Sequence, residues 1–548
     1  MNEPQTSASA VAPPQPPPGA GPRVHRGDLG WPLDRAARLH GDAPAVVADG
    51  RTLTYRELKR RVDGLGGALA QLGVAPGERV GVLAENSLAH LEAWLGIPAH
   101  GRVICDLNFR LAEAELAYIA DDSGLETLLT DDAWLETARN LRDRCPALTR
   151  LVHTGPGPCP DDCLDYAELV ATEPVAPAAL HPDTLAAISY TGGTTGLPKG
   201  VMLSHGNLLA NAQHNIVSVG HRHEDSFLHV CPMFHVAGTA NVLAATWVGA
   251  RQVVLPRFAP DTVAETVERE RITLMLLVPT MIARLLDHLD EHAVDISAVR
   301  ELGYAASPVP PRTQRRMLER FDCRVAQFYG MTEAAPSVTR LGADAHRRGL
   351  DGTPAEVARL ASAGTPLPGV ELQIRDAETD TELPPGELGE ICVRGPNIML
   401  GYWRQPEASA EALRGGWYRS GDLGRIDEDG FLFVVDRLKD MIVTGAENVY
   451  SIEVEAALVA HPAVAEAAVF GIPHPEWGEA VHATVALQDG AEVDGETLTA
   501  FCRERIAGYK VPRSYDVVRG PLPKSGAGKV LKTALRDPYW SGHDRRVS

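Results

Sequence analysis

The chain has 548 residues, of which 44% are hydrophobic and 23% are charged, so it is long enough for several compact domains with buried cores. Its formal net charge of -20 opposes binding to the phosphates of nucleic acids or to anionic lipid surfaces. We therefore expect no nucleic-acid partner. A local cationic cleft for a nucleotide remains compatible with this charge, because net charge averages over the whole surface.

Residues 1–25 are rich in Pro and Ala and lack the basic and apolar regions of a secretory signal, so we expect a disordered tail. No later run approaches the roughly 20 apolar residues needed to cross a bilayer. The eight cysteines are scattered along the chain, and we expect reduced thiols. These features together predict a cytoplasmic protein without a membrane span.

The first half of the chain alternates between helical and strand patterns. Thr54 and Glu57 have capping-box spacing, and apolar residues then recur every three or four positions from Leu58 to Leu72, which predicts an amphipathic helix ending at Gly73. The alternation that follows is typical of parallel α/β layers. The further expected elements are strands at 78–84, 272–279 and 324–328, and helices at 88–97 and 281–289.

From Gly364 onward the pattern changes to short β-prone segments separated by Pro and Gly turns. We therefore predict an α/β fold with a large N-terminal domain of α/β layers, a small β-rich subdomain and a small mobile α+β C-terminal domain. The predicted limits are 26–435 for the large domain, 364–435 for its β-rich part, 436–440 for a hinge and 441–548 for the C-terminal lid domain.

The segment 190–200, Tyr-Thr-Gly-Gly-Thr-Thr-Gly-Leu-Pro-Lys-Gly, has the composition of a phosphate-binding loop. Glycines let backbone N–H groups approach phosphate oxygens, threonine hydroxyls add donors, and Lys199 supplies a positive charge. The spacing is not that of a P-loop, so a P-loop ATPase is not indicated. A flexible Gly/Thr turn is the alternative interpretation.

Six segments, in this order, resemble motifs of the adenylate-forming superfamily, which includes acyl- and aryl-CoA ligases, firefly luciferase and the adenylation domains of peptide synthetases. The likeness covers nearly everything after the tail and is greatest to fatty-acyl and aryl-acyl CoA ligases. The segments are 190–200, Phe234-His235, 327–333, 418–422, 436–440 and 523–529.

The resemblance implies a nucleotide site. Thr191, Thr194, Thr195 and Lys199 would bind the β- and γ-phosphates in a loop that includes Gly192, Gly193 and Gly196. Glu333 and Thr195 would hold Mg²⁺, which usually takes one or two carboxylates besides phosphate oxygens. The remaining implied contacts are Thr332 with the α-phosphate, Tyr329 and Gly330 with adenine, Asp422 with the ribose hydroxyls, Arg437 beside Asp422, and Lys439 at the hinge.

The resemblance also implies a catalytic lysine and an acyl pocket. Lys529 would bridge the substrate carboxylate and the α-phosphate. His235 would act as a gate beside a pocket lined by Gly238, Tyr304, Ala305 and Ala306. Core packing remains an alternative role for Tyr329 and His235, and a surface ion pair for Arg437 and Lys439.

The activity implied is ATP-dependent conversion of a carboxylic acid to its acyl-adenylate with release of pyrophosphate, followed by transfer to CoA. Gly445 belongs to the loop that lines the thiol tunnel in relatives, but Ala446 follows it where a second glycine is common. Ser451 and Cys105-Asp106 also depart from the family pattern. A carrier-protein thiol, an amine or another small nucleophile therefore stays open as acceptor, and either a fatty or an aromatic acid as substrate.

A nucleotide-binding protein without enzymatic activity is the competing class. Decayed enzymes usually lose charged catalytic groups, whereas this chain retains all four that the resemblance identifies. These four are Lys199, Glu333, Asp422 and Lys529. The sequence thus favours an enzyme.

Overall fold

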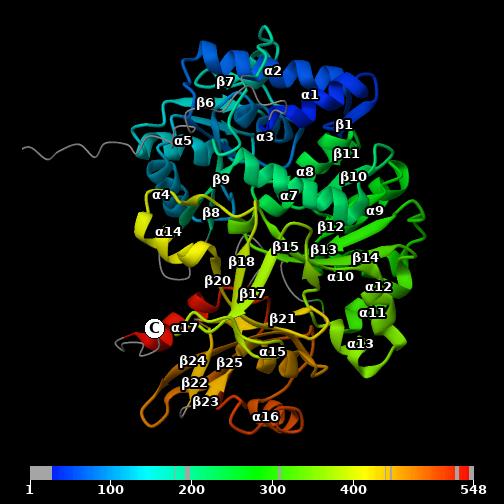
Figure 1. The fold of residues 1–548 in the computed structure, drawn as a ribbon, viewed down its shortest axis with the longest axis vertical. Helices are drawn as coiled ribbons and strands as arrows, with labels where there is room; N and C mark the ends of the chain where they lie inside the picture. The colour runs from blue at the N-terminus through cyan, green and yellow to red at the C-terminus, as the bar shows by residue number, and fades with distance from the viewer. Residues whose placement is uncertain are drawn as a thin grey trace, which may run out of the picture.

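The computed structural model describes residues 27–177, 179–191, 198–305, 309, 311–438, 440–444, 447–524 and 530–541. The predicted tail at residues 1–25 lies outside this range. Figure 1 shows the N-terminal helices at one end of the long axis, the C-terminal strands and helices at the other, and a small antiparallel sheet between them. The α/β fold class predicted from the sequence is confirmed.

The first large sheet has a parallel centre, from β14 to β1, and antiparallel strands at both edges. The carboxyl ends of its parallel strands lie at one edge, where α/β proteins place their ligands. Its strands, in spatial order, are β16 Thr365–Pro366, β15 Ser337–Leu341, β14 Arg324–Gly330, β13 Glu301–Tyr304, β12 Leu274–Leu277, β10 Ser226–His229, β11 Arg251–Val254, β1 Pro44–Ala48 and β2 Arg51–Thr54.

The second large sheet is also mainly parallel, and the antiparallel pair β8–β9 carries the two sides of the predicted phosphate loop. Its strands, in spatial order, are β19 Gly401–Tyr402, β9 Lys199–Ser204, β8 Leu185–Thr191, β4 Val103–Asp106, β3 Arg79–Leu83, β5 Thr127–Thr130, β6 Arg150–His153 and β7 Leu164–Asp165.

Helices cover both faces of the two large sheets. A central layer packs between the sheets and contributes to the largest hydrophobic core: α1 Gly30–Leu39, α2 Tyr55–Gln71, α3 Leu88–Ala99, α7 His205–Asn215 and α8 Val236–Val248. The outer face of the first sheet carries α9 Pro260–Arg269, α10 Pro279–Glu291 and α11 Pro311–Arg320. The outer face of the second carries α4 Glu113–Ser123 and α5 Leu135–Arg144. Shorter helices are α6 Tyr166–Val170, α12 Ala343–Asp351, α13 Pro354–Arg359 and α14 Pro406–Ala412, and a π-helix η1 spans Ile216–Gly220.

The predicted β-rich segment forms an antiparallel sheet of β17 Glu371–Arg375, β18 Gly389–Arg394, β20 Tyr418–Ile426 and β21 Leu432–Arg437. Asp436 and Arg437, expected to begin the hinge, instead complete β21. They do so because Leu423 and Asp422 of β20 pair with them and extend the ladder.

The C-terminal part contains an antiparallel sheet with its own core, in the order β23 Glu447–Val449, β22 Ile442–Thr444, β25 Gly478–Leu487 and β24 Val464–His474, and β26 Ser514–Val518 pairs with β25. Its helices are α15 Ser451–Val459, α16 Gly495–Arg503 and α17 Lys532–Trp540.

The helix expected after Thr54 is present as α2, and the capping box is complete. The Thr54 side chain accepts from the backbone N–H of Glu57, and the Glu57 carboxylate accepts from the N–H of Thr54. The other helices and strands expected before Gly364 are present as β3, α3, β12, α10 and β14. Among the described residues, no helix combines the length and the apolar character that crossing a membrane requires.

Candidate active site

Tyr329 and Asp422 join two sheets by a hydrogen bond between residues 93 positions apart. The Tyr329 hydroxyl, near the end of β14, donates to Asp422 Oδ2 of β20 at 2.7 Å. Burial raises the pKa of Tyr329 well above its ordinary value, and the adjacent carboxylate raises it further, so the hydroxyl keeps its proton. Arg437 Nε lies 3.6 Å from Asp422 Oδ1. A carboxylate beside a ring and a cation suits two neighbouring hydroxyls of a ribose.

The turn that carries Asp422 is fixed by hydrogen bonds from β18. Ser420 Oγ donates to the carbonyl of Ile391 at 2.6 Å and accepts from the Asp422 N–H at 3.1 Å. The N–H of Gly421, whose φ of +68° favours glycine, donates to Glu390 Oε1 at 3.1 Å. The position of Asp422 therefore depends on residues that do not themselves face the cleft.

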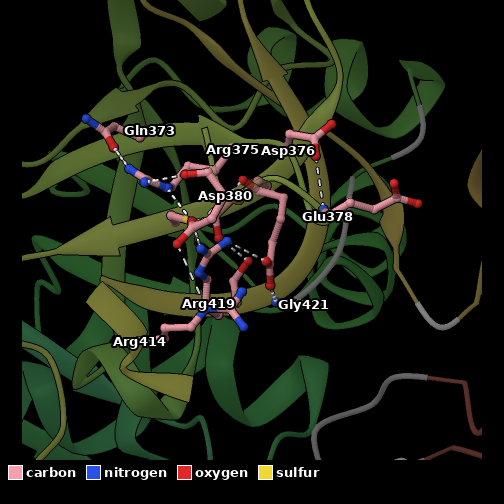
Figure 2. Close-up of polar contacts among 12 residues, drawn as sticks. Gln373, Arg375, Asp376, Glu378, Asp380, Arg414, Arg419 and Gly421 are labelled. Carbon is pink, nitrogen blue, oxygen red and sulfur yellow. Dashed lines mark hydrogen bonds and ion pairs between the residues drawn. The ribbon is translucent and has the colours of Figure 1, made fainter. Parts of the chain in front are cut away.

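Arg419 lies at the centre of the charged group that supports this turn (Figure 2). Its guanidinium pairs with Glu390, with Nη1 3.0 Å from Oε2, and also with Asp380. Asp380 in turn pairs with Arg375 at 2.8 Å and, more loosely, with Arg414 at 3.9 Å. Arg419 and Glu390 are both buried, so each charge needs the other.

Glu333 lies in the short 3₁₀ helix Thr332–Ala334 that follows β14. Its Oε1 accepts a hydrogen bond from the Tyr402 hydroxyl at 3.0 Å. Lys199 Nζ stands 5.0 Å from the centre of the Tyr402 ring, in a cation–π arrangement. Three distant segments thus bring a carboxylate, a phenol and an ammonium group together at the end of β14.

Tyr402 is a member of this group that the sequence analysis missed. The residue occupies β19, whose pairing with β9 holds it next to Lys199. An aromatic side chain inside the apolar run 399–403 is normally a core residue, so the sequence offered little signal for a place in the site.

Of the remaining predicted site residues, some are described by the structure and others are not. Thr191 and Lys199 face each other at the ends of β8 and β9, so the two sides of the phosphate loop are in place. The other predicted residues lie outside the described part of the chain, and their roles stay predictions: Gly192, Gly193, Thr194, Thr195, Gly196, Ala306, Lys439, Gly445 and Lys529.

A cavity of about 800 Å³ adjoins Tyr329. It lies between one face of the first large sheet and helix α8, and alternate strand residues form its wall. Among the predicted site residues, those that line it are His235, Gly238, Ala305, Tyr329, Gly330 and Thr332. The nucleotide groups and the cavity therefore share the segment 329–332.

Tyr304 was expected in the pocket, and the structure corrects this. Gly303 and Ala305 line the cavity, whereas Tyr304 does not. Successive strand side chains point to opposite faces, so Tyr304 enters the core between the sheet and its outer helices. There its hydroxyl is 2.9 Å from His346 Nε2, and the side chain is only 1% exposed.

Gly238 and Gly330 have a packing reason for lacking side chains. A Cβ at Gly330 would lie 2.0 Å from the carbonyl oxygen of Pro336, and one at Gly238 would lie 2.4 Å from that of Pro232. Both glycines thus allow the backbone around the cavity mouth to pack closely.

The environment of Glu333 fits a divalent cation. Burial raises the pKa of its carboxyl group, and the hydrogen bond from Tyr402 opposes that shift only in part. Within the described residues the Glu333 carboxylate accepts a hydrogen bond from Tyr402, and no cluster of three or more His, Cys, Asp or Glu side chains suited to a metal occurs. A single carboxylate suits Mg²⁺, whose other ligands are usually water and phosphate oxygens.

Three features meet at the end of β14: a carboxylate suited to ribose, a lysine suited to phosphate and an apolar cavity. Together they indicate an enzyme that binds a nucleotide next to a second substrate. Comparison with known proteins gives the particular family. Residues 33–403 match the AMP-binding enzyme family, and residues 453–529 match the C-terminal domain of AMP-binding enzymes. The chain belongs to the AMP-binding enzyme family.

Similar proteins agree with this assignment along nearly the whole chain. A feruloyl-CoA synthase of an Amycolatopsis species is 41% identical over 92% of this chain and 98% of its own length. The amide bond synthetase of Marinactinospora thermotolerans has a TM-score of 0.83 and 32% identity over 93% of this chain and 100% of its own. The o-succinylbenzoate CoA synthetase of Bacillus subtilis, solved with its acyl-adenylate intermediate, has a TM-score of 0.81 and 30% identity over 92% and 98%.

Replacement of Arg419 tests the support of Asp422. In Arg419→Met, Glu390 and Asp380 lose their shared guanidinium, so we expect a loss of about 3–5 kcal/mol in the free energy of unfolding. The KM for ATP should rise more than the KM for the acid, because the Gly421 turn loosens. Chemical denaturation and steady-state kinetics measure both quantities.

The matched control is Arg414→Met, whose side chain is 44% exposed and pairs with Glu411 on the surface. We expect it to change stability by no more than about 1 kcal/mol. Equal effects of the two substitutions would contradict a special role for Arg419.

Glu333→Gln tests the buried carboxylate through pH. Because the folded pKa of Glu333 is raised, its charge destabilises the nucleotide-free fold as pH rises above the unfolded value of about 4.3. We expect the variant to gain melting temperature over the wild type between pH 5 and pH 8. Magnesium and ATP should stabilise the wild type more than the variant at pH 8. A gap in melting temperature that does not vary with pH would count against this account.

Proposed function

We propose that the protein uses ATP to convert a carboxylic acid into its acyl-adenylate and then transfers the acyl group to the thiol of CoA. The observation that carries the proposal is the shared segment 329–332, where the nucleotide groups meet the cavity. An acid in the cavity would present its carboxylate to the α-phosphate of a nucleotide held by Asp422. This positions both reactants in one cleft.

In the first step a carboxylate oxygen attacks the α-phosphorus, a new C–O–P linkage forms, and the bond from the α-phosphorus to the bridging oxygen breaks. Pyrophosphate leaves with the bonding electron pair. Lys199 and Thr191, which pair across β8 and β9, would bind the outer phosphates. Bound Mg²⁺, held by Glu333 and with Thr195 beside it, would supply further positive charge. Lys529 would offset the repulsion between the carboxylate and the triphosphate.

In the second step the CoA thiol attacks the acyl carbon, AMP leaves, and a thioester forms. The similarity to a feruloyl-CoA synthase over 98% of that protein supports CoA as acceptor and an aromatic acid as substrate. The eight cysteines are all free in the structure, which suits the reducing cytoplasm that we propose as its location.

Transfer to an amine is the second candidate. The similarity to an amide bond synthetase favours an amine as acceptor, because the match covers the full length of that enzyme. Ala446 and Ser451, which depart from the pattern of CoA ligases, are compatible with either acceptor.

Lys529→Ala tests the adenylation step. We expect it to lower acid-dependent exchange of labelled pyrophosphate into ATP by about 10²–10³-fold, because one electrostatic group at a transition state commonly contributes that much. Thioester formation from a supplied acyl-adenylate should be largely retained. Lys524→Ala is the control, since Lys524 is paired with Glu466 within the C-terminal part. Equal loss in both half-reactions of Lys529→Ala would contradict the assigned role.

Mass spectrometry of the products tests the acceptor. We expect acyl-CoA when ATP, acid and CoA are present, and only enzyme-bound acyl-adenylate without CoA. An amide formed from added amine in preference to the thioester, or acylation of a carrier protein alone, would replace CoA as the acceptor.

A further inference from the structure

Asn241 is an amide in the cavity wall that has no hydrogen-bond partner among the described residues. It lies on α8, lines the cavity and is only 9% exposed. Its side chain makes no hydrogen bond with any residue in the described part of the chain. The other two amides of the lining differ, since Asn86 donates to the carbonyl of Cys231 at 2.9 Å and Asn215 is bonded to Asn211 at 3.3 Å.

The depth of Asn241 follows from its helix. His235 caps the start of α8 at the mouth of the cavity, and Asn241 lies six residues farther along. At a rise of about 1.5 Å per residue, the amide is about 9 Å below the mouth. Positions 238 and 241 are neighbours on one helix face, and both line the cavity, as does His235 just before the helix.

The floor of the cavity consists of apolar side chains and one carboxylate whose charge is paired. Phe227, Leu274 and Glu301 stand in register on three neighbouring strands and close the inner end. They lie about 13 Å below Ala305, at about 3.3 Å per strand residue. The Glu301 carboxylate is taken up by two guanidinium groups, each 3.0 Å away. These belong to Arg324 and Arg340.

The walls between mouth and floor suit a flat ring. Phe227, at the inner end, belongs to the apolar cluster behind the cavity, and Leu276 and Phe328 pack against that cluster. Gly303 lies between these side chains and has no side chain to fill the space between them. A Cβ at this position would lie 3.0 Å from Leu276. Aromatic rings pack favourably on such faces.

We propose that Asn241 determines specificity by hydrogen bonding to a hydroxyl group on the ring of an aromatic carboxylic acid. The inference rests on the proposed function, because the carboxylate must lie at the mouth of the cavity. An alkyl chain of the same length would leave a buried amide without a partner, which is unfavourable. A hydroxyl about 9 Å from the mouth would satisfy it, and a rigid ring holds that hydroxyl at a fixed depth.

The test compares four acids of similar length by pyrophosphate release: a hydroxylated aryl acid, the same acid without its hydroxyl, an alkanoic acid and an ω-hydroxyalkanoic acid. In the wild type we expect kcat/KM for the hydroxyaryl acid to exceed that for its unsubstituted counterpart by at least about 10-fold. Asn241→Leu, which keeps the branched shape and removes the amide, should reduce that ratio to near one. Asn140→Leu on α5, outside the cavity, should leave the ratio as in the wild type.

Asn241→Ala provides a second variant if the leucine variant does not fold, and circular dichroism checks both. A wild-type ratio near one, a ratio unchanged by either Asn241 variant, or a preference for an alkanoic or ω-hydroxyalkanoic acid would overturn the inference and leave the proposed function intact. Failure of every acid to release pyrophosphate, with these four and a wider panel, would instead overturn the proposed function.

Discussion

The hydrogen bond from Tyr329 to Asp422 is the contact on which the rest of the site depends. It ties the end of a parallel strand in the first large sheet to the small antiparallel sheet. This contact fixes the position of the Asp422 carboxylate relative to the segment 329–332, which lines the cavity. The ion pair of Glu390 and Arg419 supports this hydrogen bond, because it fixes the turn in which Asp422 lies. If Asp422 binds the ribose as proposed, the stability of this charged group is coupled to nucleotide binding.

Electrostatics in the cleft differ from those of the chain as a whole. The net charge is -20, yet Lys199 and Arg437 stand beside the groups that would face a nucleotide. Buried acids such as Glu333 are disfavoured in the charged form until a cation reaches them. The empty cleft is therefore destabilised relative to the filled one. A cation bound beside Glu333 would relieve that penalty and so add to the binding energy of the nucleotide.

Sequence patterns predicted those parts of the fold that depend on local chemistry. The capping box at Thr54 and the helical spacing after it predicted α2, which the structure contains. The Gly/Thr segment was predicted as a phosphate-binding loop, and its two ends lie side by side on β8 and β9. Contacts between distant segments were harder to predict. The resemblance assigned Tyr304 to the pocket together with Ala305, but it does not show which face of the strand each side chain takes. Tyr402 and Asn241 were missed because their neighbours come from strands far away in the chain.

The most direct test of the account is a crystal structure with a non-hydrolysable acyl-sulfamoyl analogue of an aryl adenylate. We expect both ribose hydroxyls on the Asp422 carboxylate, the sulfamoyl group beside Thr332, and the aryl group inside the cavity against α8. An analogue bound with its ribose away from Asp422, or with its aryl group outside the cavity while the nucleoside is in place, would contradict the central claim that one cleft joins both substrates.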